Sequence, residues 1–291
     1  IKSKISDYDI VIEQFRPGVM QRLGLDYQTL SEINPRLIYC SITGYGQTGG
    51  YQNKAGHDIN YVALSGIAGH SGRQHSGPPP MGIQIADISG GSLHSVIGIL
   101  AAVIERQRSG LGQYIDISMT DCVVGLSSMA AAASLAGQEK QGPEQSYLNG
   151  ATFYDYYETQ DGRYLSIGSL EPQFLHGLAQ ILELPIVAEK GASLATEDRQ
   201  VVKQAIKDKI KTQDFATWNA IFQQQDVCVE PVLKLDEALD SQLAKDRAWV
   251  VSVPLQEGST KSEQQLACPI KFSRSKIRYE FIGKPLGFDS L

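Results

Sequence analysis

The sequence predicts an α/β protein whose larger part is built on a parallel sheet. Runs rich in Ile and Val alternate with helix-like segments through roughly the first 120 residues, the pattern of repeated strand–helix–strand units. A loop with five glycines, residues 44–58, directly follows one such strand, where open α/β sheets place their ligands. Residues 138–150 are polar and rich in turn-forming residues, and a hairpin pattern follows them. A second, smaller α+β domain is therefore expected after residue 150.

The large domain, residues 1–150, is expected to open with a strand, because "DIVIEQF" is dominated by apolar residues typical of strands. Pro17 suits the first turn of the helix that follows. Pro35 ends the next helix, since a residue before proline avoids helical geometry. "RLIYCSIT" then indicates a strand that runs into the glycine-rich loop. In chain order, we expect strands at 9–15, 36–43 and 112–119, and helices at 17–24, 26–34, 59–69, 87–108 and 123–137.

The small domain, residues 151–250, is expected to begin with a β-hairpin. Two β-rich runs flank Asp161-Gly162, a dipeptide typical of tight hairpin turns. Amphipathic helices are expected at about 172–183, 197–211 and 214–224, a strand at 227–233 and a helix at 235–250. Residues 251–291 are too mixed for element assignments, and we expect them to form a segment that returns toward the large domain.

The composition narrows the functional classes. Hydrophobic residues make up 42% and charged residues 20%, as in ordinary globular domains. The net charge of −6 gives no electrostatic basis for nucleic acid as the main partner. Four widely spaced cysteines suit a reducing cytosol, so we expect a cytoplasmic protein. We expect no membrane partner, because no apolar run approaches about 18 residues; the Ala-rich 123–137 segment is interpreted as a buried core helix.

Asp87 lies in "IADISGG", at the start of the long predicted helix. On local grounds it is an N-cap, because Asp commonly accepts hydrogen bonds from the first amides of a helix. The same position leaves a carboxylate open to a ligand beside Gly90 and Gly91. A role as base or nucleophile is therefore compatible with the N-cap interpretation.

Three other polar residues have both an ordinary and a functional interpretation. His57, in "AGHDINY", is either in a surface turn or a general base. Glu171, in "SLEPQF", either starts a helix before Pro172 or supplies a catalytic carboxylate. Arg16, in "FRPG", is either a surface residue or a phosphate ligand. The histidines interpreted as structural or exposed are His70, His75, His94 and His176.

Familiar catalytic motifs are absent from the sequence. No group of His, Cys, Asp and Glu has metal-ligand spacing, so we expect no metal. "GYGQTGG" lacks the Lys-Ser/Thr ending of a phosphate loop, and no "GxSxG" segment occurs.

Taken together, several segments resemble the family III CoA-transferases (the CaiB/BaiF type). "IVIEQFRPGVMQRLGL", "NPRLIYCSITGYGQTGGY", "AGHDINY", "IADISGG", "SLEPQF" and "VCVEPVLKLDEAL" follow one another in the family's order, and the resemblance extends over about residues 8–287. Within the superfamily the chain is most similar to the α-methylacyl-CoA racemases.

The resemblance implies a Rossmann-like CoA-binding domain, a small α+β domain and an interlocked homodimer. It implies a site between the large domain of one subunit and the small domain of the other, with acyl-CoA as substrate and no separate cofactor. The family's first strand and helix, with basic CoA-binding residues, are expected to precede Ile1, and its last helix to follow Leu291. Matching positions imply catalytic roles for His57, Asp87 and Glu171, and acyl-CoA binding by Arg16, Gly56, His57, Asp58, Ile59, Asn60 and Tyr61.

The chemistry that the resemblance implies is inversion of a carbon next to a thioester. A proton must leave one face and another must arrive on the opposite face, so two acid/base groups are needed. An imidazole, with an ordinary pKa of about 6.5, suits one face, and an adjacent Glu171 would orient it. Asp87 would serve the other face, helped by desolvation. Backbone amides at the start of the 87–108 helix are candidate donors to the enolate oxygen.

Two other functions stay open at the level of sequence. In a CoA-transferase of the same superfamily, Asp87 would attack the thioester and form a mixed anhydride. Such transferases carry a glycine-rich lid loop in the small domain, and residues 151–250 contain no such run, which favours the racemase. The third possibility is a non-catalytic binding or scaffold protein; the intact His57, Asp87 and Glu171 argue against it.

Overall fold

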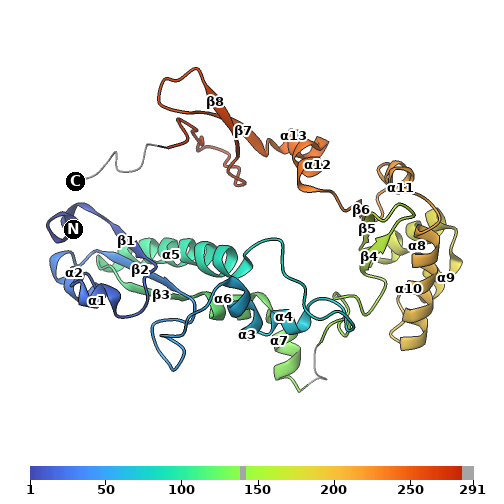
Figure 1. Ribbon diagram of the computed structural model, residues 1–291, viewed down its shortest axis with the longest axis horizontal. Helices are drawn as coiled ribbons and strands as arrows, with labels where there is room; N and C mark the ends of the chain where they lie inside the picture. The colour runs from blue at the N-terminus through green and yellow to red at the C-terminus, as the bar shows by residue number, and fades with distance from the viewer. Residues whose placement is uncertain (138–141, 284–291) are drawn as a thin grey trace.

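The computed structural model describes residues 1–137 and 142–283, which form two lobes and a returning segment (Figure 1). The first lobe contains a parallel three-stranded sheet with the order β1-β2-β3. The parallel sheet predicted from sequence is confirmed, and the mixed α/β fold class with it. The strands are β1 (Ile10–Glu13), β2 (Ile38–Thr43) and β3 (Tyr114–Ser118).

Helices cover both faces of this sheet. Ile38 and Cys40 of β2 face one side and pack against Ile99 and Ala102, whereas Tyr39 faces the other and packs near α2. The alternation follows from the two-residue period of a strand, and it explains why β2 is buried almost throughout. The helical elements are η1 (Lys2–Asp7), α1 (Val19–Arg22), α2 (Tyr27–Ile33), α3 (Asp58–Leu64), α4 (Ile67–His70), η2 (Ala86–Leu93), α5 (His94–Ser109), α6 (Met119–Leu126) and α7 (Ser128–Leu135).

The second lobe packs helices on an antiparallel sheet, as the hairpin pattern predicted. The chain turns between the first two strands at Gly162, whose φ of 78° favours glycine. The strand order is β4-β5-β6. Its elements are β4 (Asp155–Glu158), β5 (Tyr164–Ile167), α8 (Pro172–Leu182), α9 (Pro185–Lys190), α10 (Thr196–Ile210), α11 (Phe215–Phe222) and β6 (Val229–Pro231).

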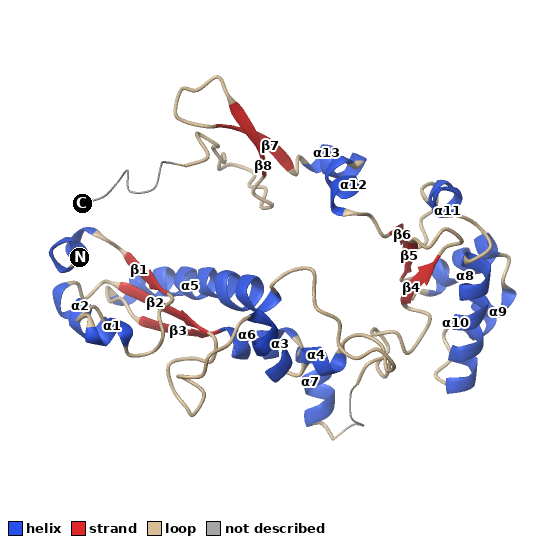
Figure 2. Cartoon of the chain, in the orientation of Figure 1, coloured by secondary structure: helices blue, strands red, loops and turns tan. Residues whose placement is uncertain are grey.

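After β6 the chain leaves the second lobe and runs back toward the end of the molecule where the first lobe lies (Figure 1). It passes through two short helices and one hairpin, and loop makes up much of the remainder (Figure 2). The elements are α12 (Leu235–Asp240), α13 (Gln242–Arg247), β7 (Val250–Pro254) and β8 (Ser262–Leu266).

Three predicted helices are wrong in detail because a single residue interrupts each of them. The 59–69 helix breaks at Gly66, which has a φ of 88°. The 235–250 helix breaks at Ser241, whose hydroxyl accepts a hydrogen bond from Ala244 N at 3.1 Å and so starts a new helix. The Ala-rich helix breaks at Ser127, and its second half has no buried residue; Leu135 is 89% exposed. The second half is therefore not a core helix, whereas Val123 in the first half is buried, as predicted.

The predicted long helix at 87–108 is present, but residues Ala86–Leu93 form the π-helix η2. Among the described residues, one helix, Ala86–Ser109, could cross a membrane by length and composition alone, with a mean hydropathy of 1.5. The statement that no apolar run approaches that length is wrong for this segment. One such helix is weak evidence for a membrane span, because the core helices of other proteins pass the same test. In this helix Ile99 and Ala102 are buried against the sheet.

A cluster of ion pairs joins the two lobes. The Asp155 carboxylate, at the start of β4, accepts from Arg73 and from Lys203, with both contacts at 2.6 Å. Arg73, in the loop after α4, also contacts Glu144 at 3.1 Å. Burial tends to raise the pKa of Asp155, but the two cations outweigh it and the net direction is downward. The carboxylate therefore stays charged and links Arg73 of the first lobe to Lys203 of the second.

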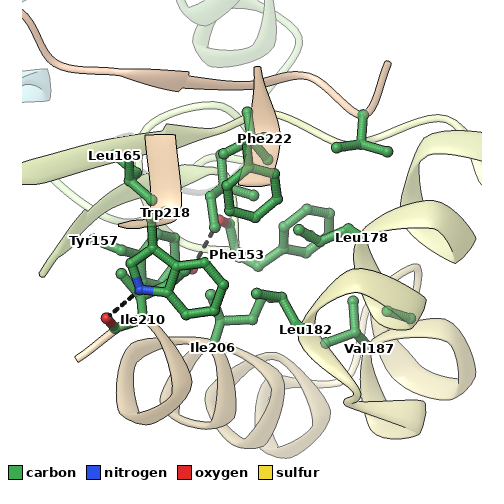
Figure 3. Packing of buried hydrophobic residues seen from close by; sticks show 14 of the residues in the cluster. Phe153, Tyr157, Leu165, Leu178, Leu182, Val187, Ile206, Ile210, Trp218 and Phe222 are labelled. Atoms are coloured by element: carbon green, nitrogen blue, oxygen red, sulfur yellow. Dashed lines mark hydrogen bonds between the residues drawn. The ribbon is translucent and has the colours of Figure 1, made fainter. Parts of the chain in front are cut away.

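The core of the second lobe is centred on Trp218 (Figure 3). Its indole N–H donates to the carbonyl of Ile210 at 2.7 Å, and its ring stacks on Phe222 with centroids 5.7 Å apart. Trp218 is 1% exposed. Around it lie Phe153, Tyr157, Leu165, Leu178, Leu182, Val187 and Ile206.

Replacing Trp218 with alanine is expected to lower the free energy of unfolding of the second lobe by about 3–5 kcal/mol, because it removes a buried aromatic side chain and leaves a cavity. Urea unfolding followed by circular dichroism measures this loss. Trp249→Ala is the matched control, since Trp249 is 37% exposed, and a clearly smaller loss is expected there. Equal losses in the two variants would contradict the central position of Trp218.

Candidate active site

A cavity of about 390 Å³ lies at the carboxyl edge of the parallel sheet. The strands of a parallel sheet end at the same edge, so the loops that follow β1 and β2 meet there. The helix starts at α3, η2 and α6 complete the wall. The lining residues are Gln14, Phe15, Arg16, Pro17, Ile42, Thr43, Gly44, Tyr45, Gln52, Lys54, Ala55, Gly56, His57, Tyr61, Asp87, Ser92 and Met119.

His57 is the N-cap residue of α3, and its backbone is fixed on both sides. Its N–H donates to Asn60 Oδ1 at 3.0 Å. The hydroxyl of Tyr61 donates to the carbonyl of Gly56 at 2.6 Å. Gly56 has to be glycine, because a Cβ there would lie 2.7 Å from both Tyr45 Oη and Tyr61 Cε1. His57 lines the cavity, where its imidazole can meet a ligand.

Asp87 lies in the first turn of η2 and also lines the cavity. The N-cap interpretation of Asp87 is wrong, because Ile85 holds the N-cap position. Partial burial is the largest cause that raises the pKa of Asp87, and the nearby charge of Asp58 raises it further, whereas His57 acts in the opposite direction. A carboxyl group with a raised pKa is a better base and a more available acid near neutral pH.

The raised pKa of Asp87 has a consequence for stability. The folded protein binds this proton more tightly than the unfolded chain does, so the contribution of Asp87 to stability is present below the unfolded pKa of about 3.9 and is lost as pH rises through the folded pKa. Asp87→Asn is therefore expected to have a higher Tm than the wild type at pH 7, with the difference shrinking as pH falls. Thermal melts by circular dichroism from pH 4.5 to 8 measure it, with Asp121→Asn on the exposed side of α6 as control. A Tm for Asp87→Asn at or below that of the wild type at pH 7 would contradict the upward direction.

The backbone amides at the start of η2 were expected to donate hydrogen bonds to the enolate oxygen. That expectation is wrong for the amides of residues 86–88, which already have acceptors. Those of Ala86 and Asp87 already donate to Asp58 Oδ1, at 2.6 and 3.2 Å. The amide of Ile88 donates to the carbonyl of Gln84 at 2.9 Å. These three amides are therefore not available to an enolate oxygen.

The predicted binding residues divide into two groups. Arg16, Gly56, His57 and Tyr61 line the cavity, whereas Asp58, Ile59 and Asn60 do not. Binding of acyl-CoA by each of these residues stays a prediction.

Several lining residues were not predicted from sequence. Tyr45, Gln52 and Lys54 come from the glycine-rich loop, which had been recognised as functional without its polar side chains being singled out. Thr43, at the end of β2, is 8% exposed, and its hydroxyl has no hydrogen-bond partner among the described residues. Their common signal is position, because Thr43 ends β2 and the other three lie in the loop that follows it.

Comparison with known proteins identifies the family. The family model described as "CoA-transferase family III" matches residues 3–290. The chain belongs to CoA-transferase family III. The family recognised from the sequence motifs is thereby confirmed.

Members of CoA-transferase family III with different activities are similar to this chain. The α-methylacyl-CoA racemase of Mus musculus is 41% identical over 84% of this chain and 64% of the racemase. The succinyl-CoA:glutarate CoA-transferase of Homo sapiens is 30% identical over 80% of this chain and 53% of the transferase. The crystal structure of a CAIB/BAIF family protein from Brucella suis superposes with a TM-score of 0.77 at 28% identity, covering 96% of this chain and 73% of that protein. The chain thus spans less than two thirds of the length of both curated relatives.

Glu171, the third catalytic residue implied by the family resemblance, lies outside the cavity. It is the N-cap residue of α8 in the second lobe, with Pro172 at the first helical position, as the helix-start interpretation predicted. Its exposed carboxylate makes no capping hydrogen bond, and its charge adds to burial in raising the pKa of Cys228. Within one chain the structure therefore brings together His57 and Asp87 but not Glu171.

No three His, Cys, Asp or Glu side chains in residues 1–137 and 142–283 are grouped so that they could hold a metal ion. The expectation that the chemistry uses no metal and no separate cofactor stays a prediction.

Proposed function

We propose that this family III member is a racemase or epimerase that inverts the C2 stereocentre of 2-methylacyl-CoA thioesters. The observation that carries the proposal is that His57 and Asp87 line one cavity, an imidazole and a carboxylate whose pKa is raised. Two acid/base groups of this kind are what a 1,1-proton transfer requires. The 41% identity to a racemase supports it.

In the proposed reaction His57 takes the proton from C2, and the electrons of the broken C–H bond form the enolate of the thioester. Protonated Asp87 then delivers a proton to the opposite face and becomes a carboxylate. The reverse direction starts from ionised Asp87 and protonated His57. Each turnover leaves the proton of the pair on His57 instead of Asp87, which is the state that the reverse reaction needs, so both enantiomers can be processed by the same pair.

A CoA-transferase is the alternative, and the similarity to a human CoA-transferase supports it. In that reaction the Asp87 carboxylate would attack the thioester carbonyl, release CoA and form a mixed anhydride. CoA would then pass by way of Asp87 to an acceptor acid, and the donor acid would be released. This reaction gives His57 no role, although His57 lines the same cavity.

One experiment separates these functions and the non-catalytic alternative. The protein is incubated with a 2-methylacyl-CoA in D₂O, with and without an acceptor carboxylic acid. Deuterium at C2 without the acceptor supports the racemase. Acceptor-dependent transfer of CoA with no deuterium at C2 would support the transferase, and no reaction of either kind would support the scaffold.

We further propose that a second copy of the chain, in an interlocked homodimer, supplies Glu171 beside His57. Apolar side chains left exposed on α5 and α7 are surfaces that a second copy could cover: Val96, Ile97, Leu100, Ile104, Met129 and Leu135. All four cysteines are free, which suits the cytosolic location that we propose.

Subunit sharing predicts complementation between two inactive variants. Co-expressed His57→Ala and Glu171→Ala chains should regain activity, because a mixed dimer contains one site with both residues intact. Random pairing makes half of the dimers mixed, so about a quarter of the wild-type rate is expected. The separately expressed variants are the controls, and no gain on co-expression would contradict the shared site.

A further inference from the structure

Asp58 connects the helix that starts beside His57 to the helix that carries Asp87. It is the first residue of α3, and its Oδ1 accepts from the N–H of Ala86 at 2.6 Å and from the N–H of Asp87 at 3.2 Å. These two amides begin η2, 28 residues further along the chain. A single carboxylate oxygen thus holds the first turn of the helix that presents the second acid/base group.

These amides need an acceptor from outside their own helix. The first N–H groups of a helix have no partner within it, and a Ser, Thr, Asp or Asn at the N-cap usually supplies one. Here the N-cap residue is Ile85, which makes no side-chain capping bond. Ala86 is fully buried, so water cannot replace the missing acceptor at its amide. Asp58 therefore acts as the cap from a neighbouring helix.

The later part of η2 is held by packing that does not involve Asp58. Gly90 lies so close to α6 that a Cβ would be 2.8 Å from the carbonyl oxygen of Met119. Gly91 is also close to this helix, since a Cβ there would lie 3.2 Å from Met119 Cγ. The Asp87 side chain itself has no hydrogen-bond partner among the described residues, so the direction of its carboxylate depends on how the backbone of the first turn is fixed.

We propose that Asp58 is a positioning residue for Asp87, which fixes the first turn of η2 through its two backbone hydrogen bonds and so directs the Asp87 carboxylate into the cavity. The inference rests on the proposed function, because it assumes that Asp87 transfers a proton. It assigns Asp58 a role different from the acyl-CoA binding expected for it, in agreement with its place outside the cavity lining.

The charge of Asp58 has a second effect on the same group. Together with burial, it raises the pKa of Asp87, and so strengthens Asp87 as a base. The other charged or titratable groups that line the cavity are Arg16, Tyr45, Lys54, His57 and Tyr61, and His57 opposes the effect. Removal of the negative charge at residue 58 should therefore lower the pKa of Asp87.

Two substitutions separate the hydrogen bonds from the charge. Asp58→Ala removes both, and kcat for inversion is expected to fall about 10- to 100-fold with little change in KM, because a displaced catalytic group loses rate and not substrate affinity. Asp58→Asn keeps an acceptor oxygen, so most of kcat should return. Its pH–rate profile should differ from that of the wild type, with the limb that reports Asp87 moved to lower pH.

Amide hydrogen exchange of residues 86–93 supplies a readout that needs no activity. Asp58→Ala should exchange faster there than the wild type, whereas Asp58→Asn should stay close to it. Asp121→Asn, on the exposed side of α6, is the control for both measurements. Faster exchange in Asp58→Ala with no racemisation by the wild type would retain the cap and refute the proposed function. Unchanged exchange and unchanged kcat in Asp58→Ala would overturn the inference.

Discussion

Replacement of His57 by alanine is expected to lower kcat for inversion by about 10²–10⁴-fold, the usual contribution of a general acid/base. KM should change little, because the substitution leaves the loop that holds Gly56 and the hydrogen bond between Tyr61 and the Gly56 carbonyl in place. Circular dichroism of the product enantiomers, or chiral chromatography after hydrolysis, measures the rate. Exogenous imidazole should restore part of it, since the imidazole of His57 has space in an open cavity.

His75→Ala is the matched control for this prediction, because His75 is exposed in the loop before η2 and does not line the cavity. Its kcat should equal that of the wild type. A His57→Ala variant with near-normal inversion would remove His57 from the mechanism. Full CoA transfer with no inversion in the same variant would favour the transferase.

Replacement of Asp87 by asparagine is expected to abolish inversion, with a loss of about 10²–10⁴-fold, while one partial reaction survives. His57 can still remove the C2 proton of one enantiomer, and in D₂O it can return deuterium to the same face. The variant should therefore exchange C2 hydrogen of one enantiomer with retention of configuration and leave the other enantiomer unlabelled. His57→Ala should show the opposite enantiomer preference.

Mass spectrometry and chiral separation of each enantiomer after incubation in D₂O provide the measurement. The two single variants control for one another, because they should differ only in which enantiomer is labelled. Exchange of both enantiomers by Asp87→Asn would show that a single base serves both faces. Loss of all exchange together with loss of CoA transfer would support a nucleophilic Asp87 instead.

Much of the fold could be predicted because the decisive signals are local. The Ile- and Val-rich runs of β1 to β3 are typical of strands buried between layers, and their alternation with helices requires a parallel sheet. The glycine-rich loop that ends at His57 follows β2, so its place at the carboxyl edge of the sheet was predictable. Asp87 follows no strand, and its place in the same site was implied by the family resemblance alone.

The features that were missed depend on contacts between distant segments. Ser127 and Ser241 interrupt helices that are continuous by composition, and a serine inside a helical pattern does not by itself indicate a break. The π-helix at Ala86 is held by Asp58 at its first amides and packs glycines closely against α6, and no periodicity reveals such contacts. Glu171 is separated from the cavity because the relevant neighbour, under our proposal, is another copy of the chain.

The π-helical form of η2 depends more on how many residues the segment contains than on which residues they are. Each residue of an α-helix turns the chain by about 100°, so an added or deleted residue rotates everything on one side of it by that angle. Asp87 must face the cavity, and α5 must keep Ile99 and Ala102 on the sheet. The wide turns of residues 86–93 connect these two orientations. The same eight residues wound as an α-helix would aim Asp87 away from the cavity even if every side chain were kept. Insertions and deletions should therefore be far rarer in this segment than substitutions.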